Sequence, residues 1–229
     1  MVKLNEPERR YLPGNIEIRE SDNGRPIITG YAAVFNKRSE NFHWDPEREF
    51  YEEIAPGAFD SVIGDDVRAM FNHDGLPLAR TKSGTLKIEQ DAIGLRYEFE
   101  APDTTLGNDL ASAIRRGDVD ASSFAFRVAD DGDRLETEGS TTIRTITKLS
   151  RLVDVSPVTY PAYPDTSVVA RSAEQLIKEQ EERERKERGD ADQSEKETIS
   201  MNAEALRSEH EQYDLENSHH QTHTTTNHD

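Results

Sequence analysis

The sequence predicts a mainly β protein with flanking helices, an α+β fold whose body is an antiparallel sheet or β-barrel. Residues 1–170 contain many short segments rich in β-branched and aromatic side chains, and turn signals separate these segments at hairpin spacing. Few segments show the periodicity of a helix. This combination favours a sheet or barrel with one or two helices packed outside it.

The first expected elements lie in the first third of the chain. Residues 27–35 form a short apolar run typical of a buried strand, whereas 41–53 are polar and are expected to form a loop. A proline and a glycine bracket 56–63, which predicts a short helix. Residues 67–73 alternate between apolar and polar side chains, so we expect a strand with His73 at the end of its core-facing row.

A hairpin and a helix are expected next. Residues 85–89 and 95–100 each alternate apolar with polar side chains, which predicts two paired strands with one solvent-facing side. Asp103 or Thr104 can cap the N-terminus of a helix that Gly117 ends. The remaining strands are expected at 121–128, 141–149 and 152–158.

Three parts of the chain differ in character. Residues 1–25 are interpreted as an N-terminal extension, 26–170 as the folded domain and 171–229 as a charged tail. The tail has one aromatic residue, Tyr213, and with so few apolar side chains burial cannot offset the entropy of ordering it. Residues 172–188 carry Glu–Lys and Glu–Arg pairs at helical spacing, which predicts a marginal helix in an otherwise disordered tail. A protein-docking role and no role are equally open for that helix.

Composition excludes several classes of function. The 229 residues include no cysteine, so disulfides, thiolate zinc sites, iron–sulfur clusters and cysteine nucleophiles are excluded. A net charge of −18 argues against a nucleic-acid-binding surface, because phosphates are held by clustered lysine and arginine. The sequence has neither an apolar signal segment nor an apolar run of membrane-spanning length, so we expect a soluble protein without an ordinary export signal.

Metal and nucleotide chemistry have little support in the sequence. Residues 1–170 contain no glycine-rich phosphate loop after a strand and no histidine spacing typical of a metal site, so we expect neither metal nor cofactor. The polar run 218–229 contains four histidines, but nothing fixes their geometry, and we expect at most adventitious metal binding in a disordered segment.

Two histidines, His43 and His73, fall within residues 1–170. His43 is expected in a loop and has the weaker context. His73 lies at the mouth of an expected strand, and its neutral imidazole can accept a proton near neutral pH. A hydrogen-bonded structural role is the alternative interpretation of a histidine at a strand end.

A base of this kind needs a nucleophile, which without cysteine is serine, threonine or lysine. Ser122 and Ser123 stand where the expected helix leads into a strand. Asp154 lies between two valines, an unusual place for a carboxylate, and is a candidate to orient the imidazole. A solvent-facing position is equally open for Asp154, because it shares one face of its strand with Leu152 and Ser156.

Several short motifs follow one another in a fixed order along the chain. They include Gly-Tyr-Ala-Ala-Val-Phe-Asn at 30–36, Asn-His-Asp at 72–74 and Ser-Phe-Ala-Phe at 123–126. The others lie at 54–59, 77–81, 94–95, 105–110, 116–119 and 153–163. In this order and spacing the chain resembles the prohead (capsid maturation) proteases of tailed phages.

The resemblance implies the fold of the herpesvirus assemblins, an antiparallel β-barrel flanked by helices that works as a serine protease. Matched motif by motif, it implies His73 as general base, Ser123 as nucleophile and Asp154 as the orienting acidic residue. Ser122 stands where a larger apolar residue is more usual, so it remains an alternative nucleophile, and an aspartate stands at 154 where glutamate is frequent. Backbone N–H groups near the nucleophile are the expected oxyanion donors.

The resemblance also implies a serine endopeptidase that cuts the major capsid protein or scaffold segment during procapsid maturation, and then itself. Its expected partners are those two substrates and further copies of itself, without nucleic acid, membrane or cofactor. Its expected location is the assembling procapsid in the host cytoplasm. The alternative is a non-enzymatic scaffold or assembly protein that keeps the protease-like fold and docks coat subunits through residues 171–229.

Overall fold

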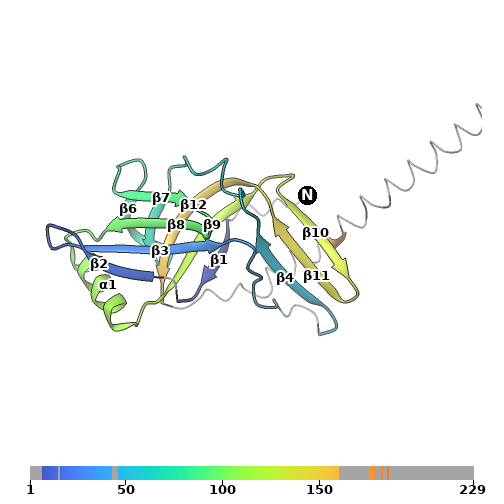
Figure 1. Ribbon diagram of the computed structural model, residues 1–229, viewed down its shortest axis with the longest axis horizontal. Helices are drawn as coiled ribbons and strands as arrows, with labels where there is room; N and C mark the ends of the chain where they lie inside the picture. The colour runs from blue at the N-terminus through green and yellow to red at the C-terminus, as the bar shows by residue number, and fades with distance from the viewer. Residues whose placement is uncertain are drawn as a thin grey trace, which may run out of the picture. The chain divides into compact units, whose positions relative to one another are not determined.

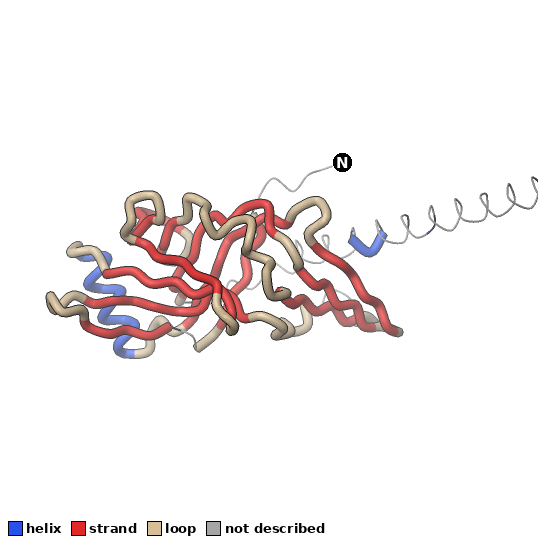
Figure 2. Tube along the Cα trace, turned by 45° about the horizontal axis from the view of Figure 1, so that its top comes forward, coloured by secondary structure: helices blue, strands red, loops and turns tan. Residues whose placement is uncertain are grey.

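The computed structural model describes residues 7–14, 16–42, 46–159, 176–178, 182 and 185. The chain forms two units, Met1–Glu174 and Gln175–Asp229, and the sheets lie in the first unit. The described residues of that unit form twelve strands and one α-helix, so the predicted mainly β class is confirmed (Figure 1). Coloured by secondary structure, strands fill most of this unit and the helix lies at one end (Figure 2).

The strands pair into three sheets. In chain order the elements are β1 (Glu8–Leu12), β2 (Ile16–Glu20), β3 (Pro26–Val34), β4 (Glu49–Ile54), β5 (Arg68–Phe71), β6 (Asp74–Arg80), β7 (Leu86–Gln90), β8 (Gly94–Glu100), α1 (Thr105–Arg116), β9 (Ala121–Val128), β10 (Asp133–Glu138), β11 (Thr141–Ile146) and β12 (Leu149–Val158). The strand orders are β1-β9-β12-β5-β6, β10-β11-β4 and β2-β3-β8-β7.

The predicted closed antiparallel barrel is wrong. Within the described residues the three sheets are open, and two strand pairs, β5 with β12 and β4 with β11, are parallel. Parallel neighbours are joined by long crossover connections, so hairpin spacing along a sequence does not reveal them. The parallel pairing of β5 with β12 matters for the site, because it brings residues near 70 beside residues near 155.

The predicted helix is confirmed as α1. Thr104 caps its N-terminus, accepting a hydrogen bond from the Gly107 backbone N–H at 3.2 Å. Gly117 ends it with a φ of 79°, a left-handed conformation that glycine adopts without strain. Leu110 and Ile114 point from α1 into the core, so the helix covers the sheets with one apolar side.

The helix predicted at 56–63 is wrong. These residues form a succession of turns, with backbone hydrogen bonds from Ala58 to Ala55 and from Asp60 to Gly57. Gly57 has a φ of 86°, which is incompatible with a right-handed helix at that position. The segment nevertheless buries Phe59 completely. The apolar residues of this segment therefore do contact the core, although they do so from turns and not from a helix.

Several strands form in segments for which no strand was predicted. Residues 8–20, expected as an N-terminal extension, contain β1 and β2, and the loop expected at 41–53 contains most of β4. The β1 sequence, Glu-Arg-Arg-Tyr-Leu, is rich in charged side chains, and it forms a strand through its pairing with β9. Pairing between distant segments therefore decides the structure at these positions.

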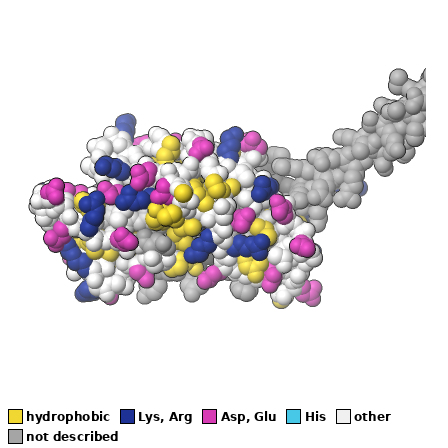
Figure 3. All heavy atoms as spheres, viewed as in Figure 1, with side chains coloured by type: hydrophobic (Ala, Val, Ile, Leu, Met, Phe, Trp, Pro, Cys, Tyr) yellow, Lys and Arg dark blue, Asp and Glu magenta, His cyan; other side chains and the backbone are white. Residues whose placement is uncertain are grey.

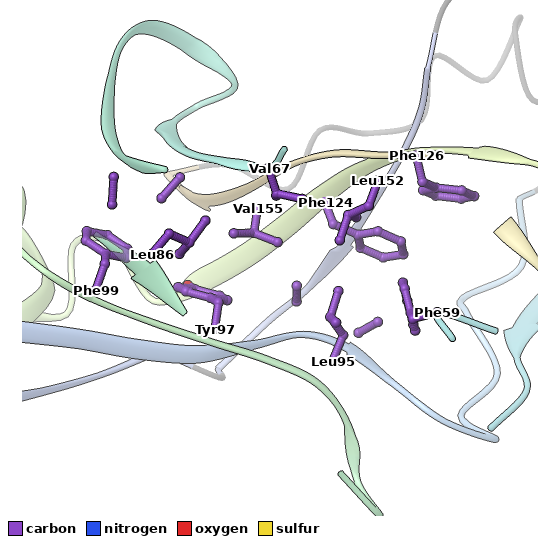
Figure 4. Close-up of a cluster of buried hydrophobic side chains, with 14 of the residues drawn as sticks. Phe59, Val67, Leu86, Leu95, Tyr97, Phe99, Phe124, Phe126, Leu152 and Val155 are labelled. Atoms are coloured by element: carbon purple, nitrogen blue, oxygen red, sulfur yellow. The ribbon is translucent and has the colours of Figure 1, made fainter. Parts of the chain in front are cut away.

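The main core is built from aromatic and aliphatic side chains of β3, β8, β9 and β12 and of the turns near residue 59 (Figure 4). The rings of Phe124 and Phe126 stack with centroids 4.7 Å apart, and Phe59 meets Phe124 edge-on at 5.8 Å. Such ring pairs add to the stabilisation from area burial. The core thereby fixes β9, the strand that carries both candidate serines.

Charges of both signs are interspersed on the face of the described residues in Figure 3, with apolar side chains between them. Among the described helices none is long and apolar enough to cross a membrane. In the tail, residues 176–178, 182 and 185 are helical. The rest of the helix expected at 172–188, and the histidine-containing run 218–229, lie outside the described residues.

Candidate active site

His73 lies between Ser123 and Asp154 and is hydrogen-bonded to both. Its Nε2 atom is 2.7 Å from the Ser123 Oγ atom, and its Nδ1 atom is 2.6 Å from the Asp154 Oδ1 atom. A hydroxyl, an imidazole and a carboxylate joined in this order can pass a proton from the serine to the histidine while the carboxylate stabilises the imidazolium. The structure thus brings together the three residues that the sequence singled out.

Two neighbouring strands and the turn after a third strand of the same sheet supply these three side chains. Ser123 lies on β9 opposite Ser156 of β12, and Asp154 lies on β12 opposite Ala125 of β9. Because side chains alternate along a strand, Ser123 and Asp154 point to the same face of the sheet. β5 pairs with the other edge of β12, so the turn after β5 delivers His73 onto that face.

The turn that carries His73 differs from the prediction of a strand running through residue 73. β5 ends at Phe71, and Asn72 and His73 form the two-residue connection to β6, with φ values of 54° and 60°. Positive φ at both central residues is what a type I′ hairpin turn requires, and asparagine tolerates it better than most residues. His73 therefore leaves the core-facing row and points toward β9 and β12.

Asn72 fixes this turn against the end of β12. Its backbone N–H donates to the Pro157 carbonyl at 3.0 Å, and its Oδ1 accepts from the Thr159 backbone N–H at 2.9 Å and the Thr159 hydroxyl at 3.3 Å. These bonds join the turn to the strand that carries Asp154. No role was predicted for Asn72, although an asparagine next to a candidate base is a signal for a turn.

Ser156 is a second residue of the site that was not predicted from the sequence. Its hydroxyl donates to Asp154 Oδ1 at 2.7 Å, so this oxygen meets both Ser156 and His73. Asp154 is only 7% exposed, and a buried carboxylate needs such partners. Alternation along β12 places Asp154 and Ser156 on one face, and this spacing was the sequence signal that Ser156 could contact Asp154. Because Asp154 is buried, its solvent-facing interpretation is wrong.

Ser122 lies apart from this constellation. Its hydroxyl is hydrogen-bonded to the Tyr97 hydroxyl at 2.8 Å, on the opposite face of β9 from Ser123. Both residues are fully buried, and this burial raises the pKa of Tyr97. The geometry therefore gives Ser123, and not Ser122, the contact with His73. His43 lies outside the described residues.

The backbone of β1 also touches the candidate nucleophile. Ser123 Oγ donates to the Arg10 carbonyl oxygen at 2.9 Å, and Tyr11 is the Cα partner of Ser123 in the β1–β9 ladder. Ser123 is 0% exposed. No sequence signal pointed to this contact, because it is made by main chain from a segment more than one hundred residues away.

The side chain of Arg10 belongs to a cluster of charges on the other face of β1. We call Glu8, Arg10, Glu52, Asp133 and Arg144 the Arg10 cluster. Arg10 and Arg144 both bind the Glu8 and Glu52 carboxylates, and Arg144 also binds Asp133 at 2.6 Å. Burial raises the pKa of Glu8, but the charges and hydrogen bonds of Arg10 and Arg144 outweigh it and lower the pKa to about 2. Among the described residues, no three His, Asp or Glu side chains gather as a metal site would require.

Comparison with known proteins gives one family. The sequence model of the caudovirus prohead serine proteases matches residues 14–180, well over half of the chain. Among solved structures, the capsid assembly protease of bacteriophage T4 is similar with a TM-score of 0.40 and 14% sequence identity, covering 68% of this chain and 98% of that chain. Structural similarity at that level carries no assignment by itself. Among curated proteins, no significant match was found.

Proposed function

Because the chain belongs to the caudovirus prohead serine proteases, we propose that it is a serine endopeptidase with Ser123, His73 and Asp154 as its catalytic residues. The observation that carries the proposal is His73 hydrogen-bonded to Ser123 on one side and to Asp154 on the other. Family membership supports a protease of capsid maturation, and the contacts of His73 support these three residues as its machinery.

In the proposed reaction Ser123 Oγ attacks the carbonyl carbon of the scissile peptide bond, and its proton passes to His73 Nε2. Asp154 accepts the Nδ1–H hydrogen bond and stabilises the imidazolium. The C–N bond then breaks, and the leaving amine takes the proton from His73. Water, deprotonated by His73, hydrolyses the acyl-enzyme and restores the serine hydroxyl. These steps involve only side chains and water.

The proposed substrates are the major capsid protein and its scaffold segment, cut inside the assembling procapsid in the host cytoplasm. We also include cleavage of the chain itself, with residues 171–229 as the first place to look for a site, and association with further copies. The alternative, a scaffold protein without activity, gives no role to the hydrogen bond between His73 and Ser123, and this contact favours the enzyme.

The test is co-expression of the chain with the major capsid protein of the same phage, followed by intact-mass analysis of both proteins. We expect truncated capsid protein with wild type and none with Ser123→Ala. Ser122→Ala is the matched control, since Ser122 is an equally buried serine on the same strand without contact to His73. Undiminished processing by Ser123→Ala, with processing lost in Ser122→Ala, rules out the assignment.

A further inference from the structure

Arginines gather on the face of the five-stranded sheet that carries the proposed catalytic residues. Arg127 lies four positions after Ser123 on β9, so the alternation of side chains places both on one face. On the neighbouring strand β12, Arg151 is the Cα partner of Arg127 (Figure 1). On β5, Arg68 is the Cα partner of Asp154, so it shares this face as well. We call Arg68, Arg127 and Arg151 the arginine row.

Burial supports this assignment of faces. Each member of the row has a sequence neighbour that is 0% exposed and belongs to the core, namely Ala69, Phe126 and Leu152. These neighbours point to the opposite face. The side chains of the row reach solvent instead, with 37% of Arg68 and 50% of Arg151 exposed. The row is therefore a surface feature beside a nucleophile that is itself buried.

The placement of Arg127 opposite Arg151 opposes stability. Side chains of cross-strand partners lie next to one another, and like charges in such a pair repel. Arg151 has an ion pair with Asp65 at 3.9 Å, but Asp65 Oδ2 already accepts the Leu152 backbone N–H at 2.9 Å. An arrangement that costs stability is expected where a function needs it.

The counter-ions near the row are shared. Asp66 accepts hydrogen bonds from Arg80, the Cα partner of Arg68 on β6, and lies 3.5 Å from the Arg68 guanidinium. Arg68, Arg80 and Arg151 thus divide the carboxylates of Asp65 and Asp66 among them. Three guanidinium groups with two carboxylates leave a positive excess here, in a chain whose net charge is −18.

We propose that the arginine row is a subsite for acidic side chains of the substrate, which bind there on one side of the scissile bond. This rests on the proposed function. Guanidinium groups bind carboxylates through paired, charge-assisted hydrogen bonds, so aspartate and glutamate are the side chains that fit. Four residues of β9 span about 13 Å, so with the reach of an arginine the row meets substrate residues about two to four positions from the cut.

The test uses three fluorophosphonate probes that differ in the charge of a flexible peptide tail. Each probe reacts with an activated serine hydroxyl by forming an Oγ–P bond and releasing fluoride, so no cleavage sequence has to be known. After a diglycine spacer the tails carry three glutamates, three glutamines or three lysines. The full-length chain is labelled at low ionic strength, where exposed charges are least screened. Ser123→Ala provides the blank.

The main variant combines Arg127→Glu with Arg151→Glu and reverses the charge of the row. Its matched control combines Arg25→Glu with Arg115→Glu. That pair changes the net charge equally, at two arginines outside the five-stranded sheet whose side chains are 50% and 46% exposed. Arg127→Gln with Arg151→Gln only removes the charge, and it serves as the test if the reversed variant fails to fold.

The quantity compared is the rate with the glutamate probe divided by the rate with the lysine probe. We expect this ratio to fall at least about fivefold from wild type to the reversed variant, as the loss of a few exposed ion pairs allows, and to fall by less in the glutamine variant. The control variant should keep the wild-type ratio. A purely structural role for the row would change the rates of all three probes by one common factor.

Two results would overturn different parts of this account. A ratio that is the same in wild type and in both variants of the row, or that falls as far in the control, overturns the acidic subsite and leaves the proposed function intact. No labelling of wild type above the Ser123→Ala blank with any of the three probes overturns the proposed function itself.

Discussion

Asn72 and Thr159 are joined by two hydrogen bonds that both end on the Asn72 Oδ1 atom, at 2.9 and 3.3 Å. Through them the turn that presents His73 is tied to the residue that follows β12. Because His73 itself has a φ of 60°, its direction depends on how firmly this turn is held. The relationship makes a residue outside the proposed catalytic set responsible for the position of the proposed base, His73.

Two substitutions of Asn72 separate the contribution of its positive φ from that of its side-chain hydrogen bonds to Thr159. Asn72→Asp keeps an oxygen acceptor and should stay close to wild type, whereas Asn72→Gly keeps the positive φ but loses the bonds to Thr159. We expect the glycine variant to lose about 1 kcal/mol of unfolding free energy. We also expect it to be labelled more slowly by a fluorophosphonate probe, which forms an Oγ–P bond with an activated serine hydroxyl and releases fluoride. Urea unfolding and labelling measured on the same samples check this. A glycine variant as active as wild type would show that the turn positions His73 without help from the Asn72 side chain.

Ser156→Ala should reduce activity because it removes a hydrogen bond from Asp154 Oδ1. A buried carboxylate that loses one partner is less firmly placed, and the loss of one such bond costs about 1–3 kcal/mol. We expect a slower rate of acylation with the fold retained. Ser61→Ala is the matched control, since it also loses a serine hydrogen bond, to the Leu149 carbonyl at 2.8 Å, but has no contact with the site. Equal rates in the two variants would remove Ser156 from the site.

The Arg10 cluster predicts a pH dependence of stability. The pKa of Glu8 is about 2 in the folded chain against an ordinary value of 4.5, so the unfolded chain binds a proton that the folded chain does not between these two values. The contribution of Glu8 is therefore present above pH 4.5 and is lost as the pH falls toward 2. Thermal unfolding of wild type and Glu8→Gln should show a Tm difference that shrinks over this range. A difference independent of pH would contradict the ionised pairing of Glu8.

Phe124 links the core to β9, the strand of the proposed nucleophile Ser123. Its ring contacts Phe59 and Phe126, and it is 1% exposed. Phe124→Ala should cost about 3–5 kcal/mol of unfolding free energy, because it opens a cavity directly beneath β9. Phe124→Leu, which keeps most of the volume, should cost less. Chemical denaturation at neutral pH gives both values, and a small loss in the alanine variant would mean that this part of the core collapses around the cavity.

Much of the site was predictable because its residues carry local signals. A histidine between asparagine and aspartate, a serine at the start of an apolar strand and an aspartate between two valines each stand out in their surroundings. The capped helix α1 was predictable for the same reason, since Thr104 and Gly117 mark its ends. Such features depend on neighbours in the sequence.

The features that could not be predicted depend on contacts between distant segments. The charged sequence of β1 gives no hint that its Arg10 carbonyl meets Ser123, and the parallel pairing of β5 with β12 is invisible in hairpin spacing. The alternation of residues 67–73 continues past the point where the chain turns, so it hid the turn at Asn72. The expected division of the chain at residues 25 and 170, the tail as a docking or autocleaved segment and self-association stay predictions.

The central claim is that Ser123 is a nucleophile activated by His73, and the site of fluorophosphonate attachment tests it most directly. The full-length chain and its His73→Ala and Ser122→Ala variants would be treated with the probe, digested and analysed by peptide mass spectrometry. The account predicts an adduct on Ser123 in wild type and in Ser122→Ala, and none in His73→Ala. An adduct on Ser122, or one on Ser123 that persists without His73, would contradict it.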